Sequence, residues 1–125
     1  KNRIKAINKL AEADYDVGIL IAPVILVDNW KNLYKELIQT LNSELSPKVK
    51  KNAFFEIIFM TYSFVHQKIN EAAFPNAIQI YDNELMRGRG KGKYSYKPEI
   101  KQEAEIYIRD LMNKYFKENK IEYIV

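Results

Sequence analysis

The segment from Arg87 to Tyr96 holds the residue types in this chain that are best suited to binding chemistry. Glycine and cationic residues alternate there, with cations at Arg87, Arg89, Lys91 and Lys93 and tyrosines following at Tyr94 and Tyr96. Glycine lets a backbone adopt positive φ and approach a ligand closely. Arginine and lysine neutralise phosphates, and a tyrosine ring can stack on an exposed base. The pattern predicts a glycine-rich β-hairpin laid against a nucleic-acid backbone.

The same segment also fits a solvated surface turn whose lysines serve only solubility, and the residues leave both readings open. Two sharper phosphate motifs are excluded. A P-loop requires Ser or Thr after its Gly-Lys pair, but Tyr94 follows Gly92 and Lys93. A dinucleotide-binding fingerprint is broken at Lys93.

Other candidate residues are more typical of structural roles. His66 is the only histidine and falls on a predicted helix, where a metal-ligand role is the less common one. Asp82 and Glu84 are typical of residues that flank a turn. The absence of cysteine excludes disulfides, thiolate zinc sites, cysteine nucleophiles and cysteine-held iron–sulfur clusters within this stretch.

Composition indicates a folded domain or a piece of one. The 125 residues are 47% apolar and 29% charged, and the net charge of +4 permits an acidic partner. The longest apolar run, residues 17–27, is well short of the about 18 residues of a membrane span. We therefore expect no membrane partner, and nothing points to secretion.

Hydrophobic periodicity predicts the elements that position the cationic segment. A helix is expected around residues 4–11, and a strand buried on both faces over 17–27, with its central part ending near Ala22 because Pro23 lacks an N–H donor. Asp28 is expected to cap a helix over 30–41, followed by a loop over 42–49. A second strand is predicted over 53–60 and a third helix over 62–73.

The last fifty residues are predicted to hold a short strand over 78–81, the hairpin, a long helix beginning at Pro98 and a closing strand over 121–125. This order is typical of a parallel α/β sheet. Two buried strands cannot form a stable sheet alone, so we expect the chain to pair with other strands or to derive from a longer protein. We divide it into strand–helix units over 1–85 and the hairpin, helix and closing strand over 86–125, within one continuous domain fragment.

Four stretches together resemble the C-terminal part of the spore photoproduct lyase family. They are Lys9–Trp30, Glu56–Ile58, Gly90–Tyr96 and Lys120–Tyr123. Members of that family are radical S-adenosylmethionine enzymes that reverse the ultraviolet thymine lesion of bacterial spore DNA. The resemblance implies a cytoplasmic protein of the spore core and an α/β fold: the C-terminal portion of a partial (β/α) barrel, with a basic glycine-rich β-hairpin and a long C-terminal helix.

The resemblance also implies cofactors. In the full-length enzyme a CxxxCxxC loop holds a 4Fe-4S cluster that cleaves S-adenosylmethionine, and the adenosyl radical abstracts hydrogen from the lesion. All of these cysteines are absent here. We therefore expect this segment alone to be inactive, to contain no catalytic residue or metal site, and to bind neither cofactor tightly.

Residue roles carry over by position. The backbone of Ala22 is expected to lie near the adenosyl group. Arg87, Arg89, Lys91 and Lys93 are expected to contact DNA phosphates, and Tyr94 and Tyr96 a base beside the extruded lesion. The expected partners are ultraviolet-damaged double-stranded DNA and the N-terminal half of the same enzyme.

Two positions depart from the family pattern. Family members often read GRYGIGKY where this chain reads RGRGKGKY, so either Arg87 or Arg89 takes the place of the family arginine. Asp14 stands where glycine is expected, which predicts strain if the turn needs positive φ.

Two further hypotheses remain. One is a stand-alone basic nucleic-acid-binding α/β module without catalysis. The other is a basic scaffold that binds protein through the exposed edges of its sheet.

Overall fold

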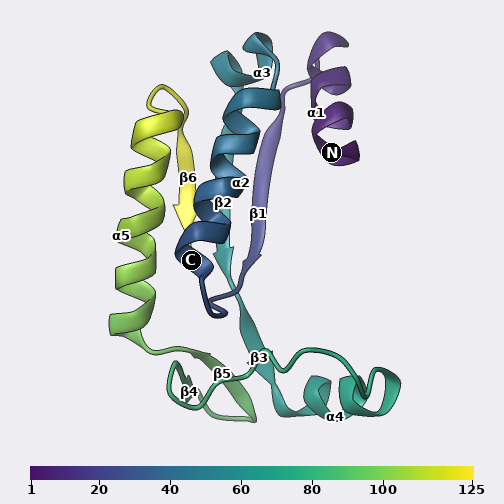
Figure 1. Ribbon diagram of the computed structural model, residues 1–125, viewed down its shortest axis with the longest axis vertical. Coiled ribbons are helices and arrows are strands. Elements are labelled where there is room, and N and C mark those ends of the chain that lie inside the picture. The colour runs from purple at the N-terminus through teal and green to yellow at the C-terminus, as the bar shows by residue number, and fades with distance from the viewer.

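Three parallel strands form the larger of two sheets in the computed structural model, which describes residues 1–125 (Figure 1). The strands are β1 (Gly18–Val24), β2 (Phe54–Phe59) and β6 (Ile121–Ile124), in the order β1-β2-β6. Helices α2 (Trp30–Glu44) and α5 (Pro98–Tyr115) pack on one face of this sheet. The chain is therefore a mixed α/β fold built on a parallel sheet, as the sequence predicts.

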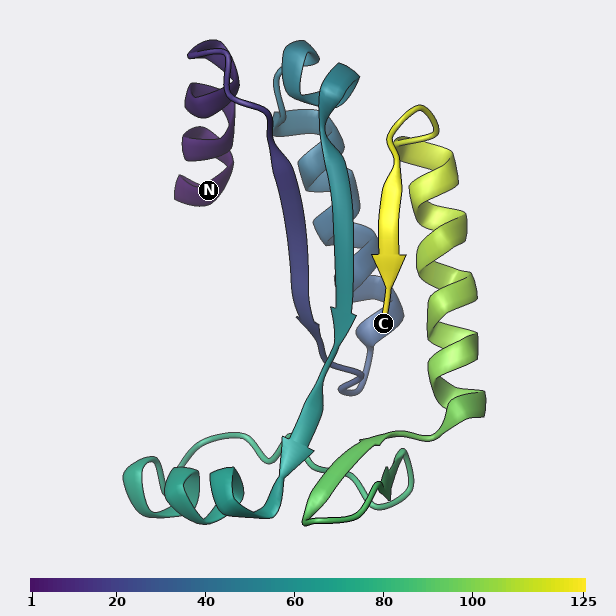
Figure 2. The ribbon, with the colours of Figure 1, turned by 180° about the vertical axis from the view of Figure 1, so that it is seen from behind.

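The smaller sheet lies beyond the carboxyl ends of the parallel strands (Figure 2). It is antiparallel, with strands β3 (Thr61–Ser63), β4 (Met86–Gly88) and β5 (Lys93–Tyr96) in the order β3-β5-β4. Only Met60 separates β2 from β3, so the central parallel strand leads directly into the smaller sheet. Helix α4 (Phe64–Ala73) follows β3 and lies beside that sheet.

The hydrophobic core lies between the parallel sheet and its two helices. Its most buried side chains come from β2, α2 and α5 and include Phe55, Ile57, Ile38, Ile108 and Met112. The Phe55 ring also packs against Phe116, with ring centroids 4.9 Å apart. Burying these apolar side chains orders the helices on the sheet.

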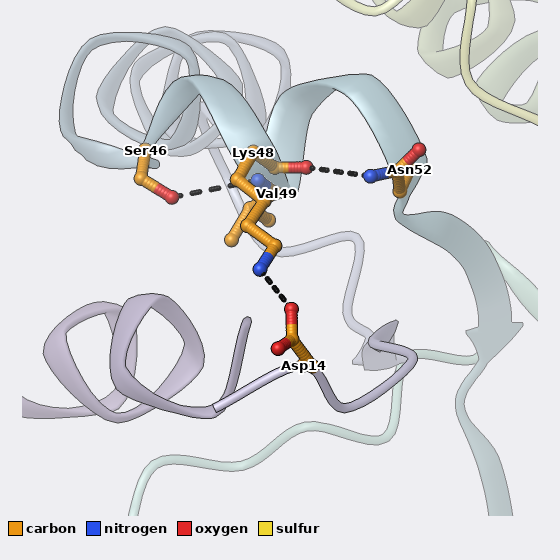
Figure 3. A network of polar contacts seen from close by, with 5 residues as sticks. All are labelled: Asp14, Ser46, Lys48, Val49 and Asn52. Carbon is orange, nitrogen blue, oxygen red and sulfur yellow. Dashed lines mark hydrogen bonds and ion pairs between the residues drawn. The ribbon is translucent and has the colours of Figure 1, made fainter. Parts of the chain in front are cut away.

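Helices α1 (Asn2–Glu12) and α3 (Pro47–Asn52) lie at the opposite end of the molecule, near the amino ends of β1 and β2 (Figure 1). Between α1 and β1, Asp14 adopts φ of +62°, the conformation that favours glycine there. The Lys48 ammonium donates to the Asp14 carboxylate (Figure 3), which holds the pKa of that carboxyl below its usual value. Ser46 caps α3 by accepting from the Val49 N–H at 3.4 Å.

The parallel strands are not buried on both faces, which corrects the sequence-based prediction. On β1, Ile19 and Ile21 face the core, whereas Leu20 is 56% exposed. The helices of this chain cover only one face, so the other is uncovered. We call it the open face; its residues are Leu20, Ala22, Phe54, Glu56, Ile58 and Tyr123.

Several local predictions are wrong. Asn29, in a left-handed conformation, precedes α2 in the N-cap position expected for Asp28. Residues 42–49 do not form a loop, because α2 continues to Glu44 and α3 begins at Pro47. Residues 78–81 form no strand. β1 continues past Pro23 to Val24, which an edge strand tolerates because proline's missing donor need not interrupt the ladder.

The remaining predicted elements are present within a few residues of their expected bounds. They are α1, β2, α4, α5 and β6. None of the helices combines the length and the hydropathy that crossing a bilayer requires.

Candidate nucleic-acid interface

The cationic segment forms a hairpin whose tip depends on glycine. Strands β4 and β5 pair antiparallel, and the Arg89 N–H donates to the Lys93 carbonyl at 2.8 Å. Three successive residues at the tip adopt left-handed φ: Gly90 at +85°, Lys91 at +52° and Gly92 at +67°. Glycine populates this region without steric cost, so two glycines allow the chain to reverse here.

The smaller sheet separates cations from aromatic rings. Register pairs Thr61 and Arg87 with Ser95, and Ser63 with Lys93. Opposed residues of an antiparallel pair share a face. One face, which we call the polar face, therefore carries Thr61, Ser63, Arg87, Lys93 and Ser95. The other face, which we call the aromatic face, carries Tyr62, Tyr94, Tyr96 and Met86.

The aromatic face packs inward. The ring of Tyr94 is half-buried and lies 4.9 Å from the Tyr81 ring, which stacks on Tyr62 at 5.4 Å. Tyr96 is only 4% exposed, and its hydroxyl oxygen accepts from the Leu26 N–H at 2.8 Å. Burial raises the pKa of Tyr96. Tyr96 belongs to the core and has no free ring face, so the structure does not support the predicted base contact by this residue.

The predicted cations are accessible. Arg87, Arg89, Lys91 and Lys93 are all exposed. The five ion pairs of the chain all lie elsewhere and involve none of these four. Their charges are therefore not neutralised within the chain, and the hairpin presents a concentrated positive surface to an anionic partner.

Two cavities meet at Arg89. The first, of about 580 Å³, lies where β2 and β6 end and is lined by Arg87, Arg89 and Lys101 among others. The second, of about 510 Å³, is lined by Arg89, Lys93 and residues of β3 and α4. Ligands of parallel α/β sheets bind at the carboxyl ends of the strands, so the first cavity is in the expected place for a binding site.

The structure brings several residues to the hairpin that sequence reasoning did not link to it. Thr61, Ser63 and His66 line the second cavity, and Lys101 lines the first. His66 lies in the first turn of α4, where Ser63 Oγ accepts from its backbone N–H at 3.2 Å and lies 2.8 Å from its Nδ1. β3 and β5 are about thirty residues apart in the sequence, and only their strand pairing brings these residues to the hairpin. No local sequence pattern predicts that pairing.

The remaining predicted residues line neither of these two cavities. Asp82 precedes a turn at residues 83–85, as expected, but Glu84 lies within that turn, and its N–H donates to Asp82 Oδ1 at 2.7 Å. Ala22 is exposed near the carboxyl end of the edge strand β1. The sequence has no cysteine, and the fold nowhere brings three or more histidine, aspartate or glutamate side chains together in a metal-binding group. The residues present therefore do not fit an iron–sulfur cluster.

Comparison with known proteins gives a consistent set of relatives. The profile of the spore photoproduct lyase family matches residues 1–125. A spore photoproduct lyase of Clostridium acetobutylicum is 29% identical over 129 residues, covering 100% of this chain and 38% of the relative. One of Bacillus subtilis is 29% identical, covering 97% of this chain and 36% of the relative. The chain thus spans little more than a third of the length of these curated relatives.

Solved structures that match this chain come from the same family as the curated relatives. A spore photoproduct lyase mutant with bound AdoMet and dinucleoside spore photoproduct matches with a TM-score of 0.89 and 26% identity, over 98% of this chain and 37% of that one. A spore photoproduct lyase complexed with dinucleoside spore photoproduct matches with the same TM-score, identity and coverage.

Proposed function

Because this chain belongs to the spore photoproduct lyase family, we propose that it is the DNA-contacting C-terminal portion of an enzyme that repairs the spore photoproduct by adenosyl-radical chemistry. The observation that carries the proposal is the hairpin. Its four cations have no carboxylate partner and lie beyond the carboxyl ends of the parallel strands. In parallel α/β folds that edge is where substrates bind.

The open face supports a role in closing a partial barrel. In a (β/α) barrel, helices cover the outer face of the strands while the other face lines the interior. Here α2 and α5 cover one face, and β1 is an edge strand with no second neighbour. We infer that further strands of the enzyme continue the sheet from β1, so that the open face lines the barrel interior.

The hairpin is the proposed DNA contact of residues 86–125. Arg87, Arg89, Lys91 and Lys93 would bind phosphates of damaged double-stranded DNA on either side of the lesion. Tyr94 borders the second cavity and is the one predicted tyrosine with a partly accessible ring. Related structures named for their dinucleoside spore photoproduct support this substrate class.

The cofactors would be held mainly by residues outside this chain. S-adenosylmethionine and a 4Fe-4S cluster supply the adenosyl radical in the proposed enzyme, and the cluster ligands must come from elsewhere because this sequence has no cysteine. Ala22 is exposed near the carboxyl end of β1, and its backbone is the proposed point where this chain borders the adenosyl group. We propose that the full-length enzyme acts in the cytoplasm of the spore core.

Salt-dependent DNA binding by the full-length protein tests the hairpin. Replacing its four cations with alanine removes their charges from the DNA interface, and each phosphate that is no longer neutralised should flatten the slope of log K against log salt by about 0.9. The matched control removes four exposed cations from α1 and its N-cap, at the opposite end of the molecule: Lys1, Arg3, Lys5 and Lys9. The control variant should keep the wild-type slope. Equal slopes in both variants would show that the hairpin does not contact DNA.

The alternative is a nucleic-acid-binding module without catalysis, which the exposed and unpaired hairpin cations would serve equally well. Repair assays separate the two. Conversion of spore photoproduct in DNA to two thymines by the anaerobically reconstituted full-length protein supports the enzyme. Tight binding that does not distinguish damaged from undamaged duplex, without conversion, supports the module.

A further inference from the structure

We propose that the second cavity, between the start of α4 and the hairpin, binds one phosphate group of the DNA strand, with His66 as a neutral hydrogen-bond donor beside Arg89 and Lys93. This inference rests on the proposed function for the source of the phosphate. It adds a contact from α4, an element outside the hairpin.

Strand pairing builds the floor of this cavity. Ser63 of β3 is in register with Lys93 of β5, so the hydroxyl and the ammonium group share the polar face. The Arg89 N–H donates to the Lys93 carbonyl, which holds the start of the hairpin tip beside them. Thr61, two residues before Ser63 and on the same face of β3, also lines the cavity.

The first turn of α4 is held against the hairpin tip. The Phe64 N–H donates to the Gly92 carbonyl at 2.9 Å, so the helix begins at the point where the hairpin turns. This contact places His66 on the cavity with Arg89 and Lys93, although 23 or more residues separate it from both in sequence.

The contacts of the His66 ring leave one nitrogen for a ligand. Ser63 Oγ lies 2.8 Å from Nδ1 and also accepts the His66 backbone N–H. A hydroxyl can accept from the backbone and donate to Nδ1 at the same time. In that arrangement the proton of a neutral imidazole is on Nε2, which becomes a donor. We assign this tautomer as part of the proposal, because the Ser63 hydroxyl can donate to Nδ1 and an anionic ligand needs the donor on Nε2.

The charge of the lining determines the ligand class. Two cations, an imidazole and two hydroxyls line the cavity together with two tyrosine rings, and no carboxylate does. A phosphate oxygen accepts from Arg89, Lys93, the His66 Nε2–H and the Thr61 hydroxyl, while the Ser63 proton stays on the bond to Nδ1, and charge-assisted hydrogen bonds are the stronger kind. A cationic or apolar ligand would leave Arg89 and Lys93 uncompensated. A phosphodiester next to those held by the rest of the hairpin fits both the lining and its position.

DNA binding by full-length His66→Ala, measured at pH 8 across a salt series, is the main test. Loss of a hydrogen bond to a charged phosphate should weaken binding about tenfold. The salt slope should not change, because a neutral donor releases no counterion. His66→Gln, which keeps an N–H donor, should recover part of the affinity. The contrasting variant is Lys91→Asn at the tip, where asparagine tolerates the left-handed backbone; its slope should flatten by about 0.9.

A second arm separates DNA from free phosphate. Inorganic phosphate is titrated into the full-length protein without DNA, while the imidazole resonances of His66 are followed by NMR. A saturable shift, together with the tenfold loss of DNA affinity in His66→Ala, supports the proposal. A saturable shift with unchanged DNA affinity overturns the DNA strand as source and identifies a site for a free phosphate.

Absence of both effects overturns the cavity as a phosphate site. The salt slope of the four-cation hairpin variant is independent of this result. A flattened slope in that variant would therefore still support the proposed function if His66 bound no phosphate. A saturable NMR shift would likewise still support a phosphate site in the cavity if the hairpin variant showed that the hairpin does not contact DNA.

Discussion

The hydroxyl oxygen of Tyr96 accepts a hydrogen bond of 2.8 Å from the backbone N–H of Leu26, 70 residues away in the sequence. The adjacent N–H, that of Ile25, donates to the Tyr34 hydroxyl, also at 2.8 Å. Two tyrosines thus satisfy consecutive donors just after β1. The Tyr96 bond joins β5 of the hairpin to the segment that follows the parallel strand, and so sets where the hairpin cations lie relative to the sheet.

Tyr96→Phe should lower the free energy of unfolding by about 1–3 kcal/mol. The ring still fits, but the Leu26 N–H is left buried without an acceptor, and a buried unsatisfied donor carries roughly that cost. Tyr34→Phe is the matched control, because its partner Ile25 is only half-buried and water can replace the missing acceptor. Urea denaturation measures both variants. A control that loses as much stability as Tyr96→Phe would contradict this account.

Stability should also depend on alkaline pH through Tyr96. Burial raises the pKa of this phenol in the folded state above its value in the unfolded chain. Folding therefore favours the neutral phenol. Its stabilising contribution to the free energy of unfolding is complete below the unfolded pKa of about 10 and is lost as the pH rises through the folded pKa. Urea midpoints measured from pH 8 to pH 11 should fall more steeply for the wild type than for Tyr96→Phe. Parallel curves would exclude Tyr96 as the titrating group.

The ion pair of Asp14 and Lys48 should stabilise the folded state only while Asp14 is charged. Lys48 lowers the pKa of Asp14, so this contribution is present above the unfolded pKa of about 4 and lost as the pH falls through the folded value. Asp14→Asn tolerates the positive φ but removes the charge. It should unfold at a slightly lower temperature at pH 7 and at the same temperature as wild type near pH 2. The exposed pair is screened, so high salt should also narrow the difference at pH 7. A difference that persists at pH 2 would assign the effect to something other than this pair.

Gly90→Ala and Gly92→Ala should each cost the hairpin about 1–2 kcal/mol, because a side chain at left-handed φ is strained. Space is not the cause: a Cβ at Gly90 meets nothing within 4 Å, and one at Gly92 makes only ordinary contact with Phe64. Faster hydrogen exchange of the Lys93 amide, which donates to the Gly90 carbonyl, would report the loosened tip. Gly88→Ala is the control, since its φ is not positive and the added Cβ would lie 3.8 Å from the Tyr94 ring. Equal exchange rates in all three variants would show that φ strain does not govern the tip.

Local patterns predicted much of this fold because they report on neighbours in the chain. Helical periodicity identified α1, and the apolar run around Phe55 identified β2. Proline at the first helical position placed the start of α5 at Pro98. The glycine expected at position 14 anticipated the positive φ that Asp14 adopts. The family resemblance rested on stretches of this kind and agrees with the family profile match.

The errors in prediction have long-range causes. The apolar run of β1 indicated burial on both faces, but which face is covered depends on where α2 and α5 pack. Residues 78–81 have the composition of a strand and yet form none, and the ring of Tyr81 packs between Tyr62 and Tyr94 instead.

The amino-acid sequence by itself determined which residues carry charge, where the chain can reverse and which family it resembles. Only the tertiary structure decided that Tyr96 turns into the core and that His66 joins Arg89 and Lys93 around one cavity. The reason is physical: side-chain alternation along a strand is encoded locally, but the face that becomes buried is decided by pairing with segments tens of residues away.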